Sequence, residues 1–177
     1  MSKKVVSLVI LAGFIIIVSY TLINHFSVKP VDYIMLDRYD GNMIDFSLKD
    51  IDGQSHAITG NSGKPKLINF WTSWCKYCKK EAEELNKLYS KYSSEIDFVS
   101  VNVTMSDNVE DAQKFIKEYQ IGFPVLYDDK GTVSSQYRVM GIPTNYFVRK
   151  DGTILAVTED VNFKNADELI KKLIGTE

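Results

Sequence analysis

The chain has 177 residues, a formal net charge of −2 and a sequence pI near 5.7. This length fits one domain or a small pair of domains. Lysine and glutamate residues are interspersed along the chain without a basic cluster, so no nucleic-acid partner is predicted.

The amino terminus contains one long stretch without charged residues. Lys3 and Lys4 precede residues 5–23, which at about 1.5 Å per helical residue cover roughly 28 Å, close to the ~30 Å hydrocarbon thickness of a bilayer. The apolar core of a cleaved signal peptide is usually only ~7–15 residues, and no convincing small-x-small cleavage site follows. An uncleaved signal-anchor is therefore favoured, and a cleaved signal peptide is the alternative.

The two lysines also predict the orientation of this stretch, because positive charge favours the cytoplasmic side of a membrane. We expect residues 1–4 in the cytoplasm, one transmembrane span at 5–23, a tether at 24–40 and a globular domain at 41–177. Within the tether, residues 33–36 form an expected short packed segment. The globular domain is then expected outside the cytoplasm.

The globular part is predicted to alternate between strands and helices. Apolar and polar residues alternate on both sides of Asp52-Gly53, which predicts a β-hairpin. The other expected elements are a strand at 66–71, a helix from 79 to about 93, a strand at 96–103, a helix at 109–119 capped by Asp107 or Asn108, a strand at 124–127, a turn at 128–131, a short helix at 133–137, strands at 144–148 and 153–157, and a helix at 166–174. Strand–helix–strand order implies parallel pairing, so we predict an α/β fold with a mixed sheet.

The only two cysteines, Cys75 and Cys78, lie between a predicted buried strand and a predicted helix. Free backbone N–H groups and the positive end of the helix dipole favour a thiolate at a helix start. Because the thiolate is the attacking species in disulfide exchange, Cys75 is the expected nucleophile and Cys78 the resolving thiol. The sequence therefore predicts a thiol–disulfide exchanger.

Three other interpretations of the pair are less favoured. A zinc site needs four N or S ligands, and the chain adds only His25 and His56 to its two cysteines. Two buried, inert thiols are disfavoured because a helix start after a strand is usually open to solvent. A structural disulfide over so short a loop would contribute little to stability.

The residues around the pair resemble a known family. Residues 69–81, Asn-Phe-Trp-Thr-Ser-Trp-Cys-Lys-Tyr-Cys-Lys-Lys-Glu, resemble the active-site run of the TlpA/ResA-like thiol–disulfide oxidoreductases, which are thioredoxin-fold proteins tethered outside the cytoplasm. Residues 123–125 and 139–144 also match, and the resemblance spans residues 40–175 in order. It implies a thioredoxin-like fold with a central mixed sheet flanked by helices and an added N-terminal β-hairpin. It also implies redox exchange, commonly as a reductant in cytochrome c maturation.

The resemblance assigns further site residues. Pro143 matches the family's cis-proline, which faces the cysteine pair and leaves the backbone of Ile142 free to pair with an extended substrate. Glu81 matches an acidic residue beneath the site, where it would exchange a proton with Cys78. Its alternative is a solvated helix glutamate. Trp74 is expected to line the substrate groove, with simple surface packing as its alternative.

Three further positions near the cysteines bear on the expected site. Asn69 replaces the buried aspartate of thioredoxin itself, and an amide cannot accept a proton at physiological pH. Trp71 is expected in the core beneath the site. Lys76, between the cysteines, would favour a thiolate by only about 1 kcal/mol in water, which cannot decide between a reductant and an oxidant.

We therefore predict a membrane-anchored enzyme of the bacterial cell membrane that reduces disulfides in exported proteins, such as apocytochrome c. The predicted catalytic residues are Cys75, Cys78 and Glu81, and the predicted substrate-binding residues are Trp74, Ile142 and Pro143. The expected partners are disulfide-bearing exported proteins and a membrane electron donor, and no metal or cofactor is predicted. Alternatives are a disulfide oxidant or isomerase, a copper-delivery protein, a peroxidase and a non-catalytic binding module.

Overall fold

The computed structural model describes residues 11–20 and 41–175, and the chain divides into two units at residues 32 and 33. In the first unit, residues 11–20 are helical and mostly exposed. Among the described residues, no helix combines the length and the apolar character needed to cross a bilayer. The rest of the predicted span, the predicted tether and its packed segment at 33–36 lie outside the described residues.

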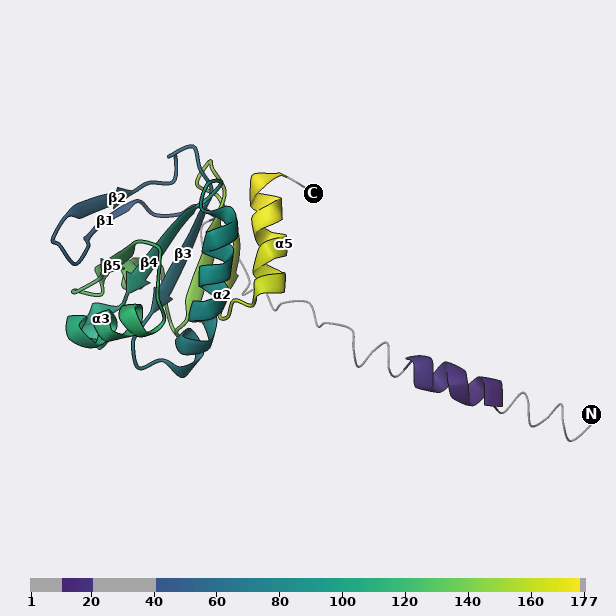
Figure 1. The fold of residues 1–177 in the computed structure, drawn as a ribbon. Helices are drawn as coiled ribbons and strands as arrows, with labels where there is room; N and C mark the ends of the chain where they lie inside the picture. The colour runs from purple at the N-terminus through teal and green to yellow at the C-terminus, as the bar shows by residue number, and fades with distance from the viewer. Residues whose placement is uncertain (1–10, 21–40, 176–177) are drawn as a thin grey trace, which may run out of the picture. The chain divides into compact units, whose positions relative to one another are not determined.

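The second unit is built on one mixed sheet with the strand order β2-β1-β5-β4-β3-β6-β7 (Figure 1). The strands are β1 (Phe46–Lys49), β2 (Ser55–Ile58), β3 (Lys66–Trp71), β4 (Asp97–Asn102), β5 (Val125–Tyr127), β6 (Thr144–Val148) and β7 (Ile154–Thr158). Strand β4 pairs in parallel with β3 and β5, whereas β6 pairs antiparallel with β3 and β7. The predicted α/β class, the mixed sheet and the N-terminal hairpin β1–β2 are thus confirmed.

Strand β3 lies inside the sheet between β4 and β6, and all six of its residues are buried. Such a strand needs apolar residues on both faces, which explains the continuous run Leu-Ile-Asn-Phe-Trp in place of an alternating pattern. The one amide in this run, Asn69, lies opposite Ser100 of β4 and Asn145 of β6. Polar groups from three strands therefore meet in the interior.

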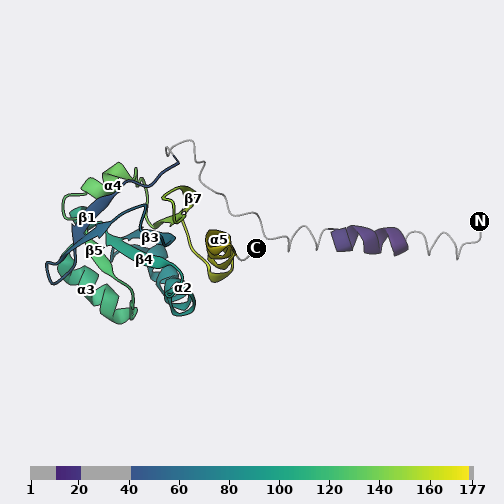
Figure 2. The same cartoon turned by 90° about the horizontal axis from the view of Figure 1, so that it is seen from above.

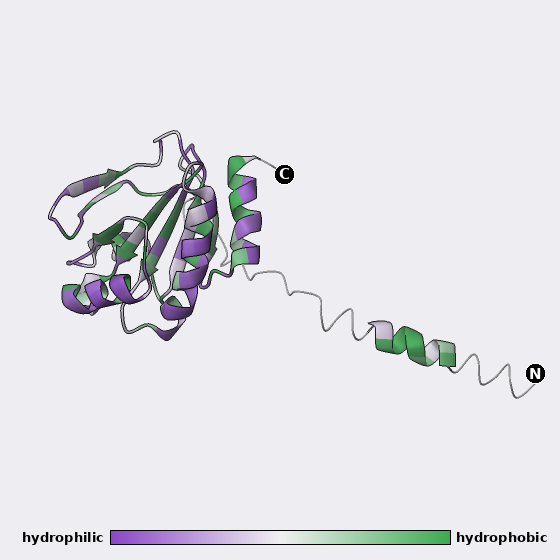
Figure 3. Cartoon of the chain, in the orientation of Figure 1, coloured by the Kyte–Doolittle hydropathy of each residue, from purple (hydrophilic) through white to green (hydrophobic). Residues whose placement is uncertain are grey.

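Helices cover both faces of the sheet. They are α2 (Lys76–Tyr92), the 3-10 turn η2 (Thr104–Ser106), α3 (Val109–Glu118), α4 (Thr132–Gln136) and α5 (Phe163–Ile174). Figure 2 shows α2, α3 and α5 on one side of the sheet and α4 on the other. The packing agrees with this view, because Leu67 contacts the α2–α5 side and Ile68, its neighbour, contacts the α4 side. Figure 3 shows that α5 carries both hydrophobic and hydrophilic residues, as expected for an amphipathic covering helix.

Helices α2 and α5 begin three residues before their predicted starts at residues 79 and 166, whereas α3 begins at Val109 as predicted. Helix α5 begins at Phe163, three residues earlier than predicted, because the Asn162 side chain accepts a hydrogen bond from the Asn165 N–H and caps the helix. Helix α3 is capped by Asn108, one of the two predicted candidates. The other candidate, Asp107, bonds instead to the loop that precedes Cys75.

A charged cluster joins α5 to α2, the helix that carries the cysteines. The buried carboxylate of Asp167 accepts hydrogen bonds from the Lys91 ammonium at 2.5 Å and the Tyr92 hydroxyl at 2.6 Å, both on α2. The Lys171 ammonium, 2.8 Å away on α5, completes the cluster. These donors, Lys171 first, hold the pKa of Asp167 well below its usual range.

We predict that Asp167→Asn lowers the free energy of unfolding by about 1–3 kcal/mol at neutral pH, because a charge-assisted cluster is broken. A lowered carboxyl pKa stabilises the fold above the unfolded pKa near 3.8, and this stabilisation is lost as the pH falls. The difference between the two proteins in denaturant titrations should therefore shrink in acid. Glu168→Gln, an equal charge change at an exposed neighbour, is the control and should have little effect; equal losses in the two variants would contradict the assignment.

Candidate active site

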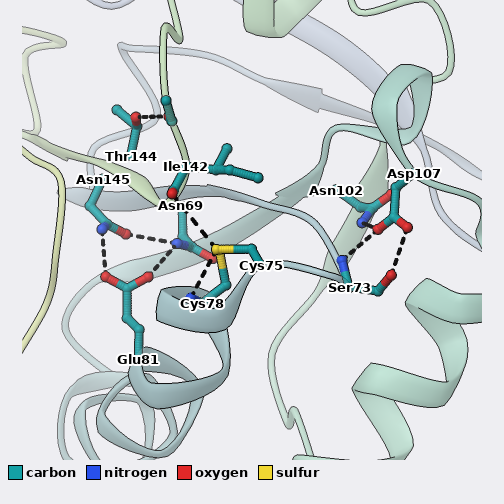
Figure 4. The surroundings of a disulfide bond; sticks show 11 residues. Asn69, Ser73, Cys75, Cys78, Glu81, Asn102, Asp107, Ile142, Thr144 and Asn145 are labelled. Atoms are coloured by element: carbon teal, nitrogen blue, oxygen red, sulfur yellow. Dashed lines mark hydrogen bonds between the residues drawn. A yellow bond between two sulfur atoms is a disulfide. The ribbon is translucent and has the colours of Figure 1, made fainter.

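The two cysteines form a disulfide at the amino terminus of α2, with their Cα atoms 5.2 Å apart (Figure 4). Cys75 is the N-cap residue, and its Sγ accepts a hydrogen bond from the Cys78 N–H at 3.0 Å. This N–H would otherwise be one of the unpaired donors of the first helical turn. After reduction, the same donor and the helix dipole would stabilise a thiolate on Cys75.

Both cysteines are more enclosed than expected for a helix start. In this disulfide form Cys75 is 4% exposed and Cys78 is 3% exposed, so the expectation of an open site is wrong. Cys75 packs with Ile142, which faces it from the loop before β6, and Cys78 packs with Trp71 and Ala82 in the core.

The Ile142–Pro143 peptide bond is cis, as the resemblance implies. The Ile142 carbonyl oxygen lies 3.7 Å from Cys75 Sγ. A disulfide sulfur carries no proton, so this is a contact in the oxidised form. In the reduced form a Cys75 thiol could donate to this carbonyl, whereas a thiolate would be repelled by it. The Ile142 carbonyl therefore favours the protonated thiol of Cys75, whereas the Cys78 N–H favours the thiolate.

Glu81 is buried, with 3% exposure, so its alternative as a solvated surface glutamate is wrong. One carboxylate oxygen accepts from the Asn145 side-chain amide at 2.7 Å, and the other from that of Asn69 at 3.1 Å (Figure 4). The Asn69 amide also donates to Asn145 Oδ1 at 2.8 Å. Helix α2 and strands β3 and β6 thus join at a single polar cluster under the disulfide.

Burial raises the pKa of Glu81 to about 8, because the surrounding protein disfavours the charged carboxylate. The amide donors oppose this effect but do not cancel it. Glu81 is three residues after Cys78 and on the same face of α2. A carboxyl group that titrates near neutral pH is suited to take up and return a proton under working conditions.

A hollow of about 420 Å³ lies between the loop before α2 and the loop before β6. Its lining includes Trp74, Met105, Met140 and Ile142, and the first three side chains are more than half exposed. The Thr72 hydroxyl at its floor is fully buried and has no hydrogen-bond partner among the described residues. Trp74 thus lies at a concave, mostly apolar surface, and its substrate-binding role stays a prediction.

Sequence reasoning missed Asn145 and Asp107. Asn145 comes from a strand 76 residues after Asn69, and only the β3–β6 register brings the two together. The Asp107 carboxylate accepts the Ser73 N–H and the Ser73 hydroxyl, each at 2.6 Å, and the Asn102 amide at 2.9 Å. Its position just before a helix start predicted only a cap. Trp71, in contrast, is in the core as predicted, with its ring centroid 4.5 Å from that of Phe115.

Known proteins resemble this chain in sequence and in fold. A model of the AhpC/TSA family matches residues 40–157. The chain belongs to the AhpC/TSA family. Within this family its relatives are thiol–disulfide oxidoreductases of the ResA type, which confirms the resemblance noted from residues 69–81.

Three relatives illustrate the match. The thioredoxin-like protein YneN of Bacillus subtilis is 35% identical over 111 residues, covering 62% of this chain and 65% of YneN, just under two thirds. The sporulation thiol-disulfide oxidoreductase A of the same organism is 34% identical over 111 residues, covering 62% of this chain and 67% of the relative. The thiol-disulfide oxidoreductase ResA of Bacillus thuringiensis is 28% identical over 130 residues, covering 72% and 74%.

A solved structure supports the fold independently. The crystal structure of a putative thiol:disulfide interchange protein DsbE from Chlorobium tepidum aligns with a TM-score of 0.68 and 25% identity, covering 76% of this chain and 96% of that one. The thioredoxin-like fold is thus shown, and this member of the AhpC/TSA family is a thiol–disulfide oxidoreductase.

We predict that Glu81→Gln changes how stability depends on pH. A carboxyl pKa raised from 4.5 to about 8 means that the folded state loses stability as the pH rises between these values, by an amount on the order of 5 kcal/mol. The glutamine variant cannot ionise and should lack this slope in denaturant titrations of the oxidised protein. Glu83→Gln, at an exposed position of α2, should keep it. Parallel pH curves for Glu81→Gln and the unmodified chain would show that Glu81 does not titrate in this window.

Proposed function

We propose that this enzyme is a membrane-anchored, extracytoplasmic oxidoreductase that reduces disulfides in exported proteins, such as apocytochrome c. One observation carries the proposal. The Cys75–Cys78 disulfide lies at the start of α2, between the Ile142 carbonyl and the buried Glu81. Such a pair can cycle between disulfide and dithiol.

The proposed reaction starts from the dithiol form. The Cys75 thiolate attacks one sulfur of a substrate disulfide, which forms a mixed disulfide and releases the other substrate sulfur as a thiolate. Cys78 then loses its proton and attacks Cys75 Sγ. This step forms the Cys75–Cys78 disulfide and releases the second substrate thiolate. Two electrons reach the substrate, and a separate dithiol donor must return two electrons to the enzyme.

In this scheme Glu81 is the proton acceptor for Cys78. Cys78 is buried, so its thiol cannot give its proton directly to bulk water. The raised pKa of Glu81 makes its ionised form a stronger base than an exposed carboxylate. Asn69 and Asn145 hold the carboxyl in place and cannot take the proton themselves. The proton would return to Cys78 when the donor reduces the disulfide.

Substrate binding is assigned to the surface around Cys75. The backbone of Ile142, beside the cis-proline Pro143, would pair with an extended substrate segment. Side chains next to the substrate cysteine would enter the hollow lined by Trp74, Met105 and Met140. This surface offers shape and apolar contact rather than charge, which suits a partner that is partly unfolded.

The proposed location rests on the amino-terminal sequence. Residues 5–23 carry no charge and follow Lys3 and Lys4, the pattern of a signal-anchor that leaves the following domain outside the cytoplasm. A cysteine pair in that compartment cannot draw electrons directly from cytosolic thioredoxin. The proposal therefore includes an electron donor protein in the membrane.

A second candidate is a role in spore formation, because one relative is named a sporulation thiol-disulfide oxidoreductase. The chemistry at Cys75 would be the same and only the substrate would differ. A disulfide oxidant or isomerase is the other alternative, and its reduction potential would be higher than that of a reductant. Copper delivery would require tight Cu(I) binding by the reduced form, and a peroxidase would consume peroxide.

The decisive experiment is covalent trapping. In a Cys78→Ala variant of the full chain, Cys75 can attack a substrate but nothing resolves the mixed disulfide. We expect disulfide-linked adducts in cells, released by a reductant and identified by mass spectrometry as exported proteins. Apocytochrome c linked through its haem-site thiols would support maturation, and a spore-envelope protein would support the second candidate.

The matched control for trapping is the double variant Cys75→Ala/Cys78→Ala, which keeps the substrate surface but lacks the nucleophile. Adducts should disappear in this control. If the Cys78→Ala chain gives no adduct beyond those of the control, disulfide exchange through Cys75 is refuted as the function.

The proposed topology predicts that Cys75 is reachable from outside the cell. In intact cells treated with a mild reductant, a membrane-impermeant maleimide should label Cys75 in the Cys78→Ala chain. A cytosolic protein with a reactive thiol, unlabelled until the cells are lysed, is the control for membrane integrity. Labelling of Cys75 only after lysis would place the domain in the cytoplasm and contradict the assignment.

A further inference from the structure

Residues 72–75 connect β3 to α2 and carry the nucleophile, so their position decides where Cys75 Sγ lies. Within this loop, the Cys75 N–H bonds to the Thr72 carbonyl at 3.3 Å. Trp74 and Ser73 of this loop form hydrogen bonds to the segment after β4. The Trp74 indole N–H donates to the Ser106 carbonyl at 2.8 Å, and Ser73 bonds to Asp107 twice. The segment after β4 therefore helps to hold the loop, in addition to the bonds between Cys75 and α2.

The Ser73–Asp107 contact is a two-point contact. One Asp107 carboxylate oxygen accepts the backbone N–H of Ser73, and the other accepts the Ser73 hydroxyl (Figure 4). A carboxylate can accept at both oxygens, whereas an amide in its place could accept at only one. Hydrogen bonds to an ionised acceptor are also shorter and stronger than neutral ones, and both distances are 2.6 Å.

Asp107 is itself fixed to the sheet. The Asn102 amide donates to it at 2.9 Å, and Asn102 is fully buried at the end of β4. The Asn102 Oδ1 accepts the Thr104 hydroxyl at 2.9 Å, which orients the amide. A chain of hydrogen bonds thus runs from the rigid end of β4 through Asp107 to Ser73, two residues before the nucleophile.

We propose that Asp107 is a positioning residue for Cys75, which it holds through Ser73 at the N-cap of α2. The inference rests on the proposed role of Cys75 as the nucleophile. The N-cap position is where the Cys78 N–H reaches Cys75 Sγ and where the helix dipole favours a thiolate. A loosened loop would place the sulfur outside this favourable position, so the thiol pKa of Cys75 would rise.

The direction in which the thiol pKa of Cys75 changes distinguishes a positioning role of Asp107 from the effect of its charge alone. Removing a negative charge near a thiol by itself favours the thiolate and lowers the thiol pKa. Asp107→Asn removes that charge and also one acceptor of the two-point contact. A raised thiol pKa in this variant can therefore come only from the lost positioning.

The test measures the alkylation rate of Cys75 by iodoacetamide against pH, in reduced full-length chains that carry Cys78→Ala. We expect Asp107→Asn to raise the pH midpoint by about half a unit, with alkylation below the midpoint about threefold slower. Ser73→Ala, which keeps the charge and loses one bond, should shift the midpoint in the same direction. Combining the two changes should add little, because both act on one contact.

The control is Glu110→Gln, an equal charge change at an exposed residue in the first turn of α3, and it should leave the midpoint unchanged. A lowered midpoint in Asp107→Asn, or thermal destabilisation with no change of midpoint, would overturn the inference. If Asp107→Asn does not fold, the Ser73→Ala midpoint decides alone. An unreactive Cys75 in the parent Cys78→Ala chain would instead refute the proposed function itself.

Discussion

The structure depends on a carboxyl group buried where three elements meet. Glu81 of α2 accepts hydrogen bonds from Asn69 of β3 and Asn145 of β6. Burial disfavours the charged carboxylate, and the two amide donors partly offset this cost while they hold the carboxyl in place. The cysteines precede Glu81 on α2, and the cis-proline loop runs directly into β6. One polar cluster therefore sets the distance between the two halves of the active site.

The sequence was sufficient to predict the parts of the site that are local. Short apolar patterns indicate the strand at 66–71 and the helix that follows the cysteines. The position of the cysteine pair at a strand–helix junction could therefore be predicted. The hairpin around Asp52-Gly53 was predictable for the same reason, because the turn residues lie between its strands. These features need no information from distant parts of the chain.

The features that depend on distant segments could not be predicted. Glu81, Glu83 and Glu84 follow one another closely on one helix, and the residues alone did not decide which one faces inward; only the family resemblance singled out Glu81. Glu81 is buried because α2 packs on β3 and β6, whereas Glu84 accepts a bond from the Phe163 N–H at the start of α5. Asp107 resembles a helix cap in sequence, and only the approach of the β4–α3 segment to Ser73 gives it a different role.

Glu81 does not set the direction of electron flow. In the proposed scheme Glu81 takes a proton from Cys78 when Cys78 attacks and returns it when the disulfide is reduced again, so it would accelerate both directions. Direction depends on how strongly the fold stabilises the Cys75 thiolate, because a more stable thiolate makes a disulfide a stronger oxidant. At Cys75 two backbone groups act in opposite ways: the Cys78 N–H at 3.0 Å favours the thiolate, and the Ile142 carbonyl at 3.7 Å favours the protonated thiol. The balance between these two groups at Cys75 therefore contributes to the reduction potential of the pair.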